Sequence, residues 1–200
     1  MSDRELTTLR GTKLGFIFQA FNLLPVLSAV ENVELPLLMA GNSPREARSM
    51  ALDALAAVGL EDRSGHLPAE LSGGEQQRVT IARSYVHGPA VILADEATGN
   101  LDTQTSDEVL DLLINLNAER GVTMVLVTHD ADVAARCSRI IVMLDGRIVE
   151  DSGSGPESDS ESSAAESDLD QSAVQNITQN ITVQDSGVTG GIGNLNGEEE

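Results

Sequence analysis

The sequence is short of several residue types, and each shortage excludes a class of protein. One cysteine, Cys137, occurs in 200 residues, which excludes a disulfide framework and a multi-cysteine metal site. Lys and Arg number 12 against 32 Asp and Glu, and this net charge of −20 argues against a nucleic-acid partner. No apolar run approaches the ~18 residues of a membrane-spanning helix, and no signal-peptide pattern is present. These shortages predict a soluble, intracellular protein with no membrane span of its own.

Basic residues are missing from the last quarter of the chain. Residues 151–200 contain 11 acidic residues, no Lys or Arg and no aromatic residue. Such a segment buries too little apolar surface to offset the entropy lost on ordering. We therefore predict a folded domain over 1–150 and a disordered, acidic tail rich in Ser and Gly over 151–200. The alternative is that the Gln-Asn-Ile-Thr repeat at 175–178 and 179–182 forms a short pairing strand.

Lysine is nearly absent, since Lys13 stands alone beside eleven arginines. An acidic, lysine-poor surface suits a salt-rich cytoplasm, where screening relieves the repulsion between like charges. A GC-rich genome that favours Arg codons gives the same composition, so a halophilic origin remains one of two interpretations.

The hydrophobic pattern predicts an α/β fold with a mostly parallel sheet. Continuous apolar runs indicate strands that are buried on both faces, and their alternation with helical segments is typical of a parallel sheet covered by helices. Asp145-Gly146 favours a tight turn, so a terminal hairpin is expected around it. The expected strands are Leu14–Gln19, Ala90–Ala94, Val122–Val127, Ile140–Leu144 and Arg147–Val149.

A mostly helical insertion is expected at about 28–87. Ser28 and Ser43 are each followed three residues later by Glu, the spacing of a capping box that begins a helix. We expect Pro36 to disturb the first of these helices. Further helices are expected at about Gly74–His87, Ser106–Asn117 and Asp130–Arg136.

Two acidic residues follow a buried strand. Asp95 and Glu96 come directly after Val91–Ala94, which places both at the carboxyl end of a parallel strand, where such folds bind ligands. One carboxylate can hold Mg²⁺ while its neighbour orients or deprotonates a water. The alternative is that both simply keep a loop solvated.

An anion site is expected at Ser72, Gly73 and Gly74. Two glycines after a serine at a helix start expose backbone N–H groups and the positive end of the helix dipole. A plain glycine-rich turn would explain the glycines but not the whole of Leu71–Arg78. His129 follows the second buried strand, and it is either structural or reaches a terminal phosphate beside Asp95 and Glu96.

Five segments together resemble the motifs of ATP-binding-cassette (ABC) ATPases, in the family's order and spacing. Gln19 resembles the Q-loop, Leu71–Gln76 the signature motif and Val91–Glu96 the Walker B motif with its catalytic glutamate. Gly99–Asp102 resembles the D-loop, and His129 resembles the switch histidine.

The amino-acid sequence of three segments is similar to that of the lipoprotein-release and macrolide-export subfamily. The segments concerned are Phe21–Pro25, Glu31–Pro36 and Ala97–Asp102. Ala97 departs from that subfamily, which usually has proline there.

The resemblance implies a role for each site residue in ATP hydrolysis. Asp95 and Gln19 would support Mg²⁺, Glu96 would polarise the attacking water, and His129 would stabilise transferring charge. Gln19 would also connect the site to a permease. In a head-to-tail pair of domains, residues of one subunit would contact the ATP that is held by the other: Ser72, Gly73, Gly74, Glu75 and Asp102.

The resemblance also implies partners and a location. The partners would be a second ATPase domain, in a homodimer or a heterodimer, and an integral-membrane permease that meets the helical subdomain at about 21–88. The protein would then be peripheral on the cytoplasmic face of the membrane.

One required element is missing from the sequence. A Walker A P-loop needs Gly-x-x-x-x-Gly-Lys-Ser/Thr, and the only lysine, Lys13, cannot complete it. Only 18 residues precede Gln19, so we expect the amino-terminal strands of the fold, including strands that flank the one before Asp95, to be absent. We expect an ABC transporter ATPase subunit in an incomplete chain that neither binds nor hydrolyses ATP by itself.

The same motifs occur in two other kinds of protein. The chain could be a non-catalytic partner or remnant that lends Ser72–Glu75 to the ATP of a complete subunit. A DNA-repair relative of the same ATPase class is disfavoured, because the long coiled-coil or zinc insertion of those proteins is absent between Gln19 and Leu71.

Overall fold

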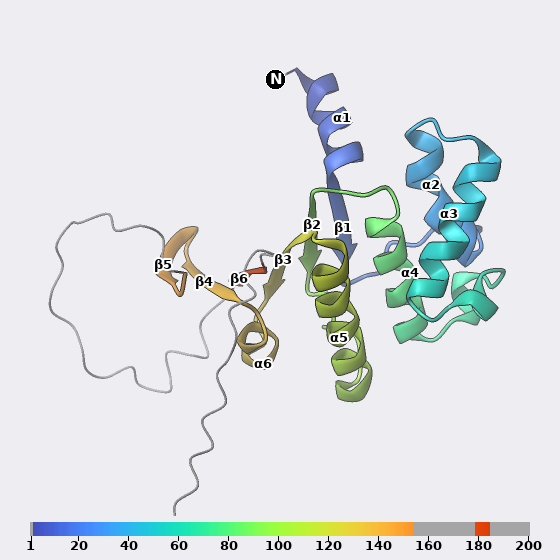
Figure 1. The fold of residues 1–200 in the computed structure, drawn as a ribbon. Helices are drawn as coiled ribbons and strands as arrows, with labels where there is room; N and C mark the ends of the chain where they lie inside the picture. The colour runs from blue at the N-terminus through green and yellow to red at the C-terminus, as the bar shows by residue number, and fades with distance from the viewer. Residues whose placement is uncertain (1, 154–178, 185–200) are drawn as a thin grey trace, which may run out of the picture.

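A computed structural model describes residues 2–153 and, for the backbone, 179–184 (Figure 1). Six strands form one sheet in the order β1-β2-β3-β6-β4-β5. Within the described residues, no helix is both long enough and apolar enough to cross a membrane. The strands are β1 (Leu14–Phe18), β2 (Val91–Asp95), β3 (Thr123–Thr128), β4 (Arg139–Leu144), β5 (Arg147–Asp151) and β6 (Gln179–Gln184).

The first three strands are parallel and in close register. Asp95 of β2 pairs with Phe18 of β1 on one side and with Val127 of β3 on the other. The carboxyl ends of all three strands therefore meet at one edge, where Gln19, Glu96 and His129 follow directly. β2 thus has both neighbours, so the expectation that its flanking strands would be absent is wrong for the strand before Asp95.

Helices pack beside and across this parallel part of the sheet. α4 contacts α2, α3, α5 and β1, and Gly15 allows this approach because a side chain there would collide with the Ser84 carbonyl oxygen. The helices are α1 (Asp3–Lys13), α2 (Ala29–Met39), α3 (Pro44–Ala57), α4 (Gly73–Tyr85), α5 (Thr103–Arg120) and α6 (Ala131–Ala135), with 3₁₀ turns at Glu61–Arg63 and Pro68–Glu70.

The predicted helix starts are confirmed at the level of individual hydrogen bonds. Ser28 and Ser43 each cap their helix with a complete capping box. Pro36 does not interrupt α2, which continues to Met39. α1 was not expected from the sequence; none of its residues is buried, and Figure 1 shows it projecting away from the other helices.

One core connects the helices with the first three strands. Its largest completely buried side chains come mostly from strands β1–β3 and from helices α2, α3, α4 and α5. They include Ile17, Ile92, Met124, Leu55, Ile81 and Leu113.

The second half of the sheet is antiparallel. β4 and β5 form the predicted hairpin, with Asp145 at φ 51° and Gly146 at φ 74° in its turn. β6 lies between β3 and β4 and is antiparallel to both, so it satisfies backbone groups that two edge strands would leave unpaired.

The prediction of disorder over 151–200 is therefore corrected where the backbone is described. Asp151 ends β5, and the second copy of the Gln-Asn-Ile-Thr repeat begins β6, which is the strand left open as an alternative. Residues 154–178 and 185–200 lie outside the described residues.

Candidate functional site

The predicted catalytic residues Glu96 and His129 lie in direct contact. Oε1 of Glu96 is 2.5 Å from Nδ1 of His129, although 33 residues separate them in the chain. The Glu96 side chain is 23% exposed and that of His129 67%, so the pair faces solvent through the histidine. The hydrogen bond with Glu96 and its negative charge raise the pKa of His129. The imidazolium is therefore favoured beside this carboxylate.

The backbone of Glu96 is held in an unusual conformation. Its φ of 49° lies in the left-handed region, which is uncommon for residues other than glycine. Its N–H donates to the Val127 carbonyl oxygen at 2.9 Å, so the neighbouring strand β3 fixes it. Backbone strain of this kind persists where the surrounding structure determines it, and it aims the Glu96 carboxylate at His129.

Gln19 is tied to the segment that follows Glu96. The Asn100 side chain donates from Nδ2 to the Gln19 carbonyl oxygen at 2.9 Å, and Gln19 Nε2 lies 3.4 Å from Asn100 Oδ1. A Cβ on Gly99 would lie 2.7 Å from Gln19 Nε2 and 3.2 Å from Glu96 Oε2. The absence of a side chain at Gly99 thus lets the amide and the carboxylate approach the same turn.

Asp95 and Gln19 supply oxygen donors at this edge. Asp95 is exposed at the end of β2, and Gln19 follows Phe18, the residue with which Asp95 pairs. A carboxylate and an amide oxygen suit Mg²⁺, which is typically held by one or two carboxylates together with substrate phosphates. Among the described residues, no three His, Cys, Asp or Glu side chains are placed so that they could hold a metal ion together.

The predicted anion site lies at the start of α4. Ser72 caps this helix: its Oγ accepts from the Glu75 N–H at 3.2 Å, and its own N–H donates to Glu75 Oε2 at 2.8 Å. These bonds lower the pKa of Glu75, with help from the Arg63 side chain 3.2 Å away. Glu75 therefore completes a capping box here, while the Ser72 hydroxyl remains exposed and keeps its proton to donate.

The two glycines of this motif differ in their surroundings. A Cβ on Gly74 would lie 2.5 Å from Cγ2 of Thr105, so α4 needs glycine there to pack against α5. A Cβ on Gly73 would meet nothing closer than 3.5 Å. Packing explains Gly74, whereas Gly73 has space for a ligand or a small side chain.

Asp102 is the N-cap of α5. Its Oδ1 accepts from the Thr105 N–H at 3.0 Å and its Oδ2 from the Thr105 hydroxyl at 2.7 Å. The same bonds lower the pKa of Asp102. The observed role is helix capping, and the predicted contact with nucleotide remains a prediction.

Apart from Asp102, the predicted site residues thus lie in two groups. Gln19, Asp95, Glu96 and His129 share the carboxyl edge of β1–β3. Ser72–Glu75 stands at the start of α4, and no hydrogen bond among the described residues joins it to Glu96 or His129. A hollow of about 310 Å³ adjoins the first group, lined partly by Glu96, Ser106 and His129.

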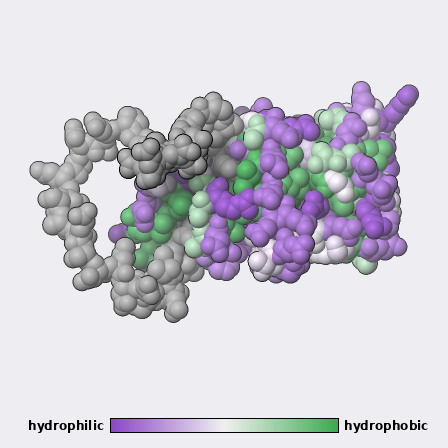
Figure 2. All heavy atoms as spheres, turned by 60° about the horizontal axis from the view of Figure 1, so that its bottom comes forward, coloured by the Kyte–Doolittle hydropathy of each residue, from purple (hydrophilic) through white to green (hydrophobic). Residues whose placement is uncertain are grey.

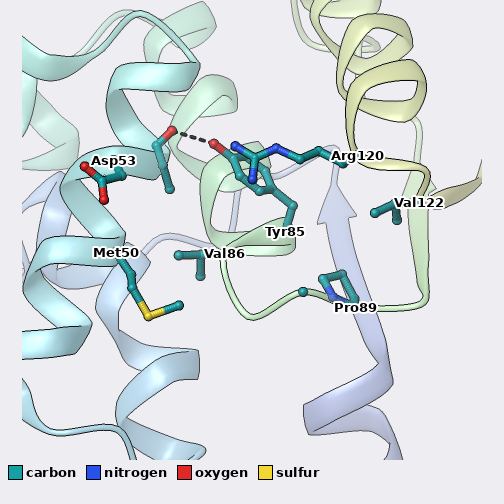
Figure 3. Close-up of a pocket in the computed structure, with 9 residues that line it drawn as sticks. Met50, Asp53, Tyr85, Val86, Pro89, Arg120 and Val122 are labelled. Carbon is teal, nitrogen blue, oxygen red and sulfur yellow. Dashed lines mark hydrogen bonds between the residues drawn. The ribbon is translucent and has the colours of Figure 1, made fainter.

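A second hollow, of about 390 Å³, lies at the opposite edge of the sheet (Figure 3). Pro89 and Val122, which precede β2 and β3, line it together with Tyr85. The Arg120 guanidinium lies 5.5 Å from the centre of the Tyr85 ring, and the Tyr85 hydroxyl donates to the Ala54 carbonyl oxygen at 2.6 Å. None of the predicted site residues lines this hollow.

Sequence reasoning missed the polar side chains that hold the loop after Gln19. Asn100 binds Gln19, Arg83 binds the Phe21 and Asn22 carbonyl oxygens, and the buried Asn32 binds Leu24. Asn100 lies within the segment identified as D-loop-like, but its partner is 81 residues away. No local spacing indicates such a pair.

Comparison with known proteins agrees with this arrangement. A family model described as ABC transporter matches residues 1–99. The structure of the bacterial ABC transporter cassette MJ0796, described as dimeric, superposes with a TM-score of 0.67 at 47% identity, covering 76% of this chain and 67% of that one. The chain belongs to the ABC transporter ATP-binding family.

Curated relatives belong to the same family. The ABC transporter ATP-binding protein YbbA of Escherichia coli K12 is 50% identical over 151 residues, which are 76% of this chain and 66% of YbbA. The macrolide export ATP-binding/permease protein MacB of Rhodopseudomonas palustris HaA2 is 52% identical over 153 residues, 23% of its length. The chain therefore spans slightly less than two thirds of YbbA and about a quarter of MacB.

Proposed function

We propose that this chain acts as the ATP-hydrolysing part of an ABC exporter of the lipoprotein-release and macrolide-export type. The observation that carries the proposal is the 2.5 Å contact between Glu96 and His129 at the carboxyl edge of β1–β3. A carboxylate and an imidazole at the ends of two neighbouring strands suit in-line phosphoryl transfer, in which positioning and electrostatics do most of the work.

Each residue of the carboxyl edge has a distinct task in this proposal. Glu96 polarises the attacking water and accepts its proton, because its carboxylate is fixed by a strained backbone and a single partner. His129 places positive charge where charge develops on the transferring phosphoryl group. Asp95 and the Gln19 amide oxygen would hold Mg²⁺, which would neutralise charge on the phosphates.

In this proposal, the start of α4 contacts the ATP of a second ATPase domain, not the ATP at the carboxyl edge of its own β1–β3. Ser72, Gly73 and Gly74 contact the γ-phosphate of ATP held by a second ATPase domain, while Glu75 and Asp102 keep the starts of α4 and α5 in shape. The exposed Ser72 hydroxyl and the open space at Gly73 support this assignment. So does the description of MJ0796 as dimeric and, in a second structure at 46% identity, as bound to ADP and Pi in a post-hydrolysis state.

A membrane permease is the proposed partner of the helical subdomain at about 21–88, within an ATPase domain over 1–150. Large apolar side chains are exposed there: Val26 is 81% exposed and Met39 87%. MacB carries ATP-binding and permease functions under one name. This partnership would hold the chain at the cytoplasmic face of the membrane.

A second candidate function rests on the sequence motif that is missing. The 200 residues contain no Gly-x-x-x-x-Gly-Lys-Ser/Thr, so the phosphates would be held by residues outside this sequence. If those residues belong to a different subunit, the chain contributes only Ser72–Glu75 to that subunit's ATP and is not itself catalytic.

The test is ATP hydrolysis by the complex that the tagged protein forms in its source cells, with Mg²⁺ and ATP. Under the leading proposal, Glu96→Gln lowers kcat by about 10²–10⁴-fold, and Ser72→Arg abolishes hydrolysis. Glu119→Gln, an exposed acid on α5, serves as the matched control and leaves the rate unchanged.

Each other result has a defined meaning. If Ser72→Arg abolishes hydrolysis but Glu96→Gln does not change it, the signature-lending partner is correct and the catalytic proposal is wrong. A complex that hydrolyses no ATP, or whose rate neither substitution changes, contradicts both candidates.

A further inference from the structure

The turn after Gln19 adopts a backbone conformation that its residues do not favour. Phe21 has φ 59° and Asn22 has φ 51°, so two consecutive residues that are not glycine lie in the left-handed region. Asparagine tolerates this region, but for a bulky residue such as phenylalanine it is an outlier. Such a turn persists only where other parts of the structure hold it.

The Arg83 side chain holds this turn through hydrogen bonds to its backbone. One terminal nitrogen of its guanidinium donates to the Asn22 carbonyl oxygen at 2.7 Å and the other donates to the Phe21 carbonyl oxygen at 3.0 Å. No carboxylate pairs with Arg83 among the residues that the structure describes. The Arg83 side chain is only partly exposed, and this burial lowers its pKa.

The same helix carries the start of the signature motif. α4 runs without a break from Gly73 to Tyr85, and Val79, Ile81 and Ala82 anchor it in the core. The Phe21 ring also lies against the start of α4, because a Cβ on Gly73 would be 3.9 Å from its Cζ atom. The left-handed turn therefore touches α4 near both of its ends.

Gln19 joins the turn to the carboxyl edge of β1–β3. Gln19 lies two residues before Phe21, and Asn100 binds it to the loop that begins with Glu96. A rigid helix, a two-carbonyl clamp and this amide pair thus form a continuous path of contacts from Ser72 to the loop after Glu96.

We propose that Arg83 is a positioning residue that couples the signature motif to Gln19. By clamping Phe21 and Asn22, it makes the turn move with α4, so that contacts made at Ser72–Gly74 reset the position of Gln19 beside Asp95 and Glu96. The phosphate part of this coupling rests on the proposed function; the clamp itself does not.

The test measures the turn in the 200-residue chain without nucleotide, by amide hydrogen exchange. The Phe21 and Asn22 N–H groups are protected by bonds to the Phe18 and Ala20 carbonyl oxygens. Arg83→Met should accelerate exchange at both amides by roughly tenfold or more, with unchanged protection of Val79–Ala82. It should also shift the NMR signals of the Gln19 side-chain amide.

Three further variants separate positioning from general stability. Arg78→Met is the matched control, because Arg78 lies on the same helix but binds Glu108 and the Val58 carbonyl oxygen; it should leave the turn unchanged. Asn22→Gly, combined with Arg83→Met, should slow exchange at residue 22 relative to Arg83→Met alone, because glycine adopts the left-handed region more readily than asparagine. Arg83→Lys, which cannot bind both carbonyl oxygens with a planar fork, should give intermediate rates.

Unchanged exchange at Phe21 and Asn22 in Arg83→Met overturns the clamp, whatever the ATPase activity. Faster exchange with an unmoved Gln19 signal overturns the positioning role. If both respond as expected but the wild-type complex hydrolyses no ATP, the proposed function fails while the assignment of Arg83 stands.

Discussion

The two halves of the sheet use similar residues and are covered very differently. Val, Ile, Leu and Met occupy β1–β3 and also β4–β5. In β1–β3 every second side chain is buried beneath helices, whereas all five residues of β5 are exposed. Leu144, Ile148 and Val149 are between 48% and 61% exposed, and Figure 2 shows hydrophobic surface at the end of the molecule where this hairpin lies.

The difference shows what apolar strands contribute by themselves. Burial stabilises by about 25 cal/mol per Å² of apolar surface removed from water, so a strand that no helix covers gains little of it. The proposed site lies on the covered half, where the Val127 carbonyl oxygen of the neighbouring strand holds the unfavourable backbone of Glu96. The proposed catalytic groups thus lie in the densely packed part of the molecule.

The largest expected effect is a loss of stability in the covered half when the buried residue Asn32 is replaced. The Asn32 side chain donates to the Leu24, Leu27 and Ser28 carbonyl oxygens and accepts from the Leu24 N–H. Asn32→Ala leaves several of these groups without a partner and should lower the free energy of unfolding by roughly 3 kcal/mol. Asn42→Ala, which removes one bond to Leu37, should cost less than about 1 kcal/mol. Urea denaturation of the two variants measures the difference, and equal losses would contradict it.

The next effect separates the two glycines of the signature motif. Gly74→Ala forces Cβ against Thr105 and should lower stability by about 2 kcal/mol through overpacking. Gly73→Ala has space and gains helix propensity, so its free energy of unfolding should not fall. Thermal unfolding decides between them. A Gly73→Ala chain as unstable as Gly74→Ala would show that Gly73 is also structural.

A smaller effect concerns the Glu96–His129 pair and its pH dependence. The pKa of His129 is raised above its ordinary value of 6.5, so the stability that the pair contributes is complete below that pH. It is lost as the pH rises through the raised pKa. An NMR titration should show the raised pKa in the wild type and its return toward 6.5 in Glu96→Gln. No change on that substitution would mean that the two side chains are not bonded in solution.

The smallest effect is expected on the exposed half. Arg139 binds both carboxylate oxygens of Asp151, and this lowers the pKa of Asp151 from 3.8 to about 2. The contribution of the pair is present above 3.8 and is lost as the pH falls through about 2. Arg139→Gln should bring the pKa of Asp151 back toward 3.8 with little change in stability, because the pair is exposed. A stability loss as large as that of Asn32→Ala would remove the contrast between the halves.

Most of the covered half could be predicted from local pattern. Ser28, Ser43 and Ser72 are followed by Glu at capping-box spacing, and each begins a helix in the structure. β1–β3 follow from their apolar runs, and Asp145-Gly146 forms the predicted turn. Pro36 is predicted to disturb α2, but the helix continues through it to Met39, with Leu37 buried in the core.

The supporting residues of the site were beyond such reasoning. The side chains of Asn100, Arg83 and Asn32 form hydrogen bonds with backbone groups of Gln19 and of the loop that follows it. No periodic sequence pattern predicts these three contacts. The roles of Gly74 and Asp102 in packing and capping likewise depend on Thr105, which only the approach of α4 to α5 reveals.

The sequence by itself determined the type of most elements between β1 and β5, the order of the motifs and the membership of the ABC family, because hydrophobic period, caps and motif spacing are local properties. Only the tertiary structure decided that Glu96 meets His129, that Arg83 clamps the turn after Gln19 and that β6 lies between β3 and β4. Those contacts join residues far apart in the chain, and the free energy of each depends on which surfaces the packed core brings within hydrogen-bond reach.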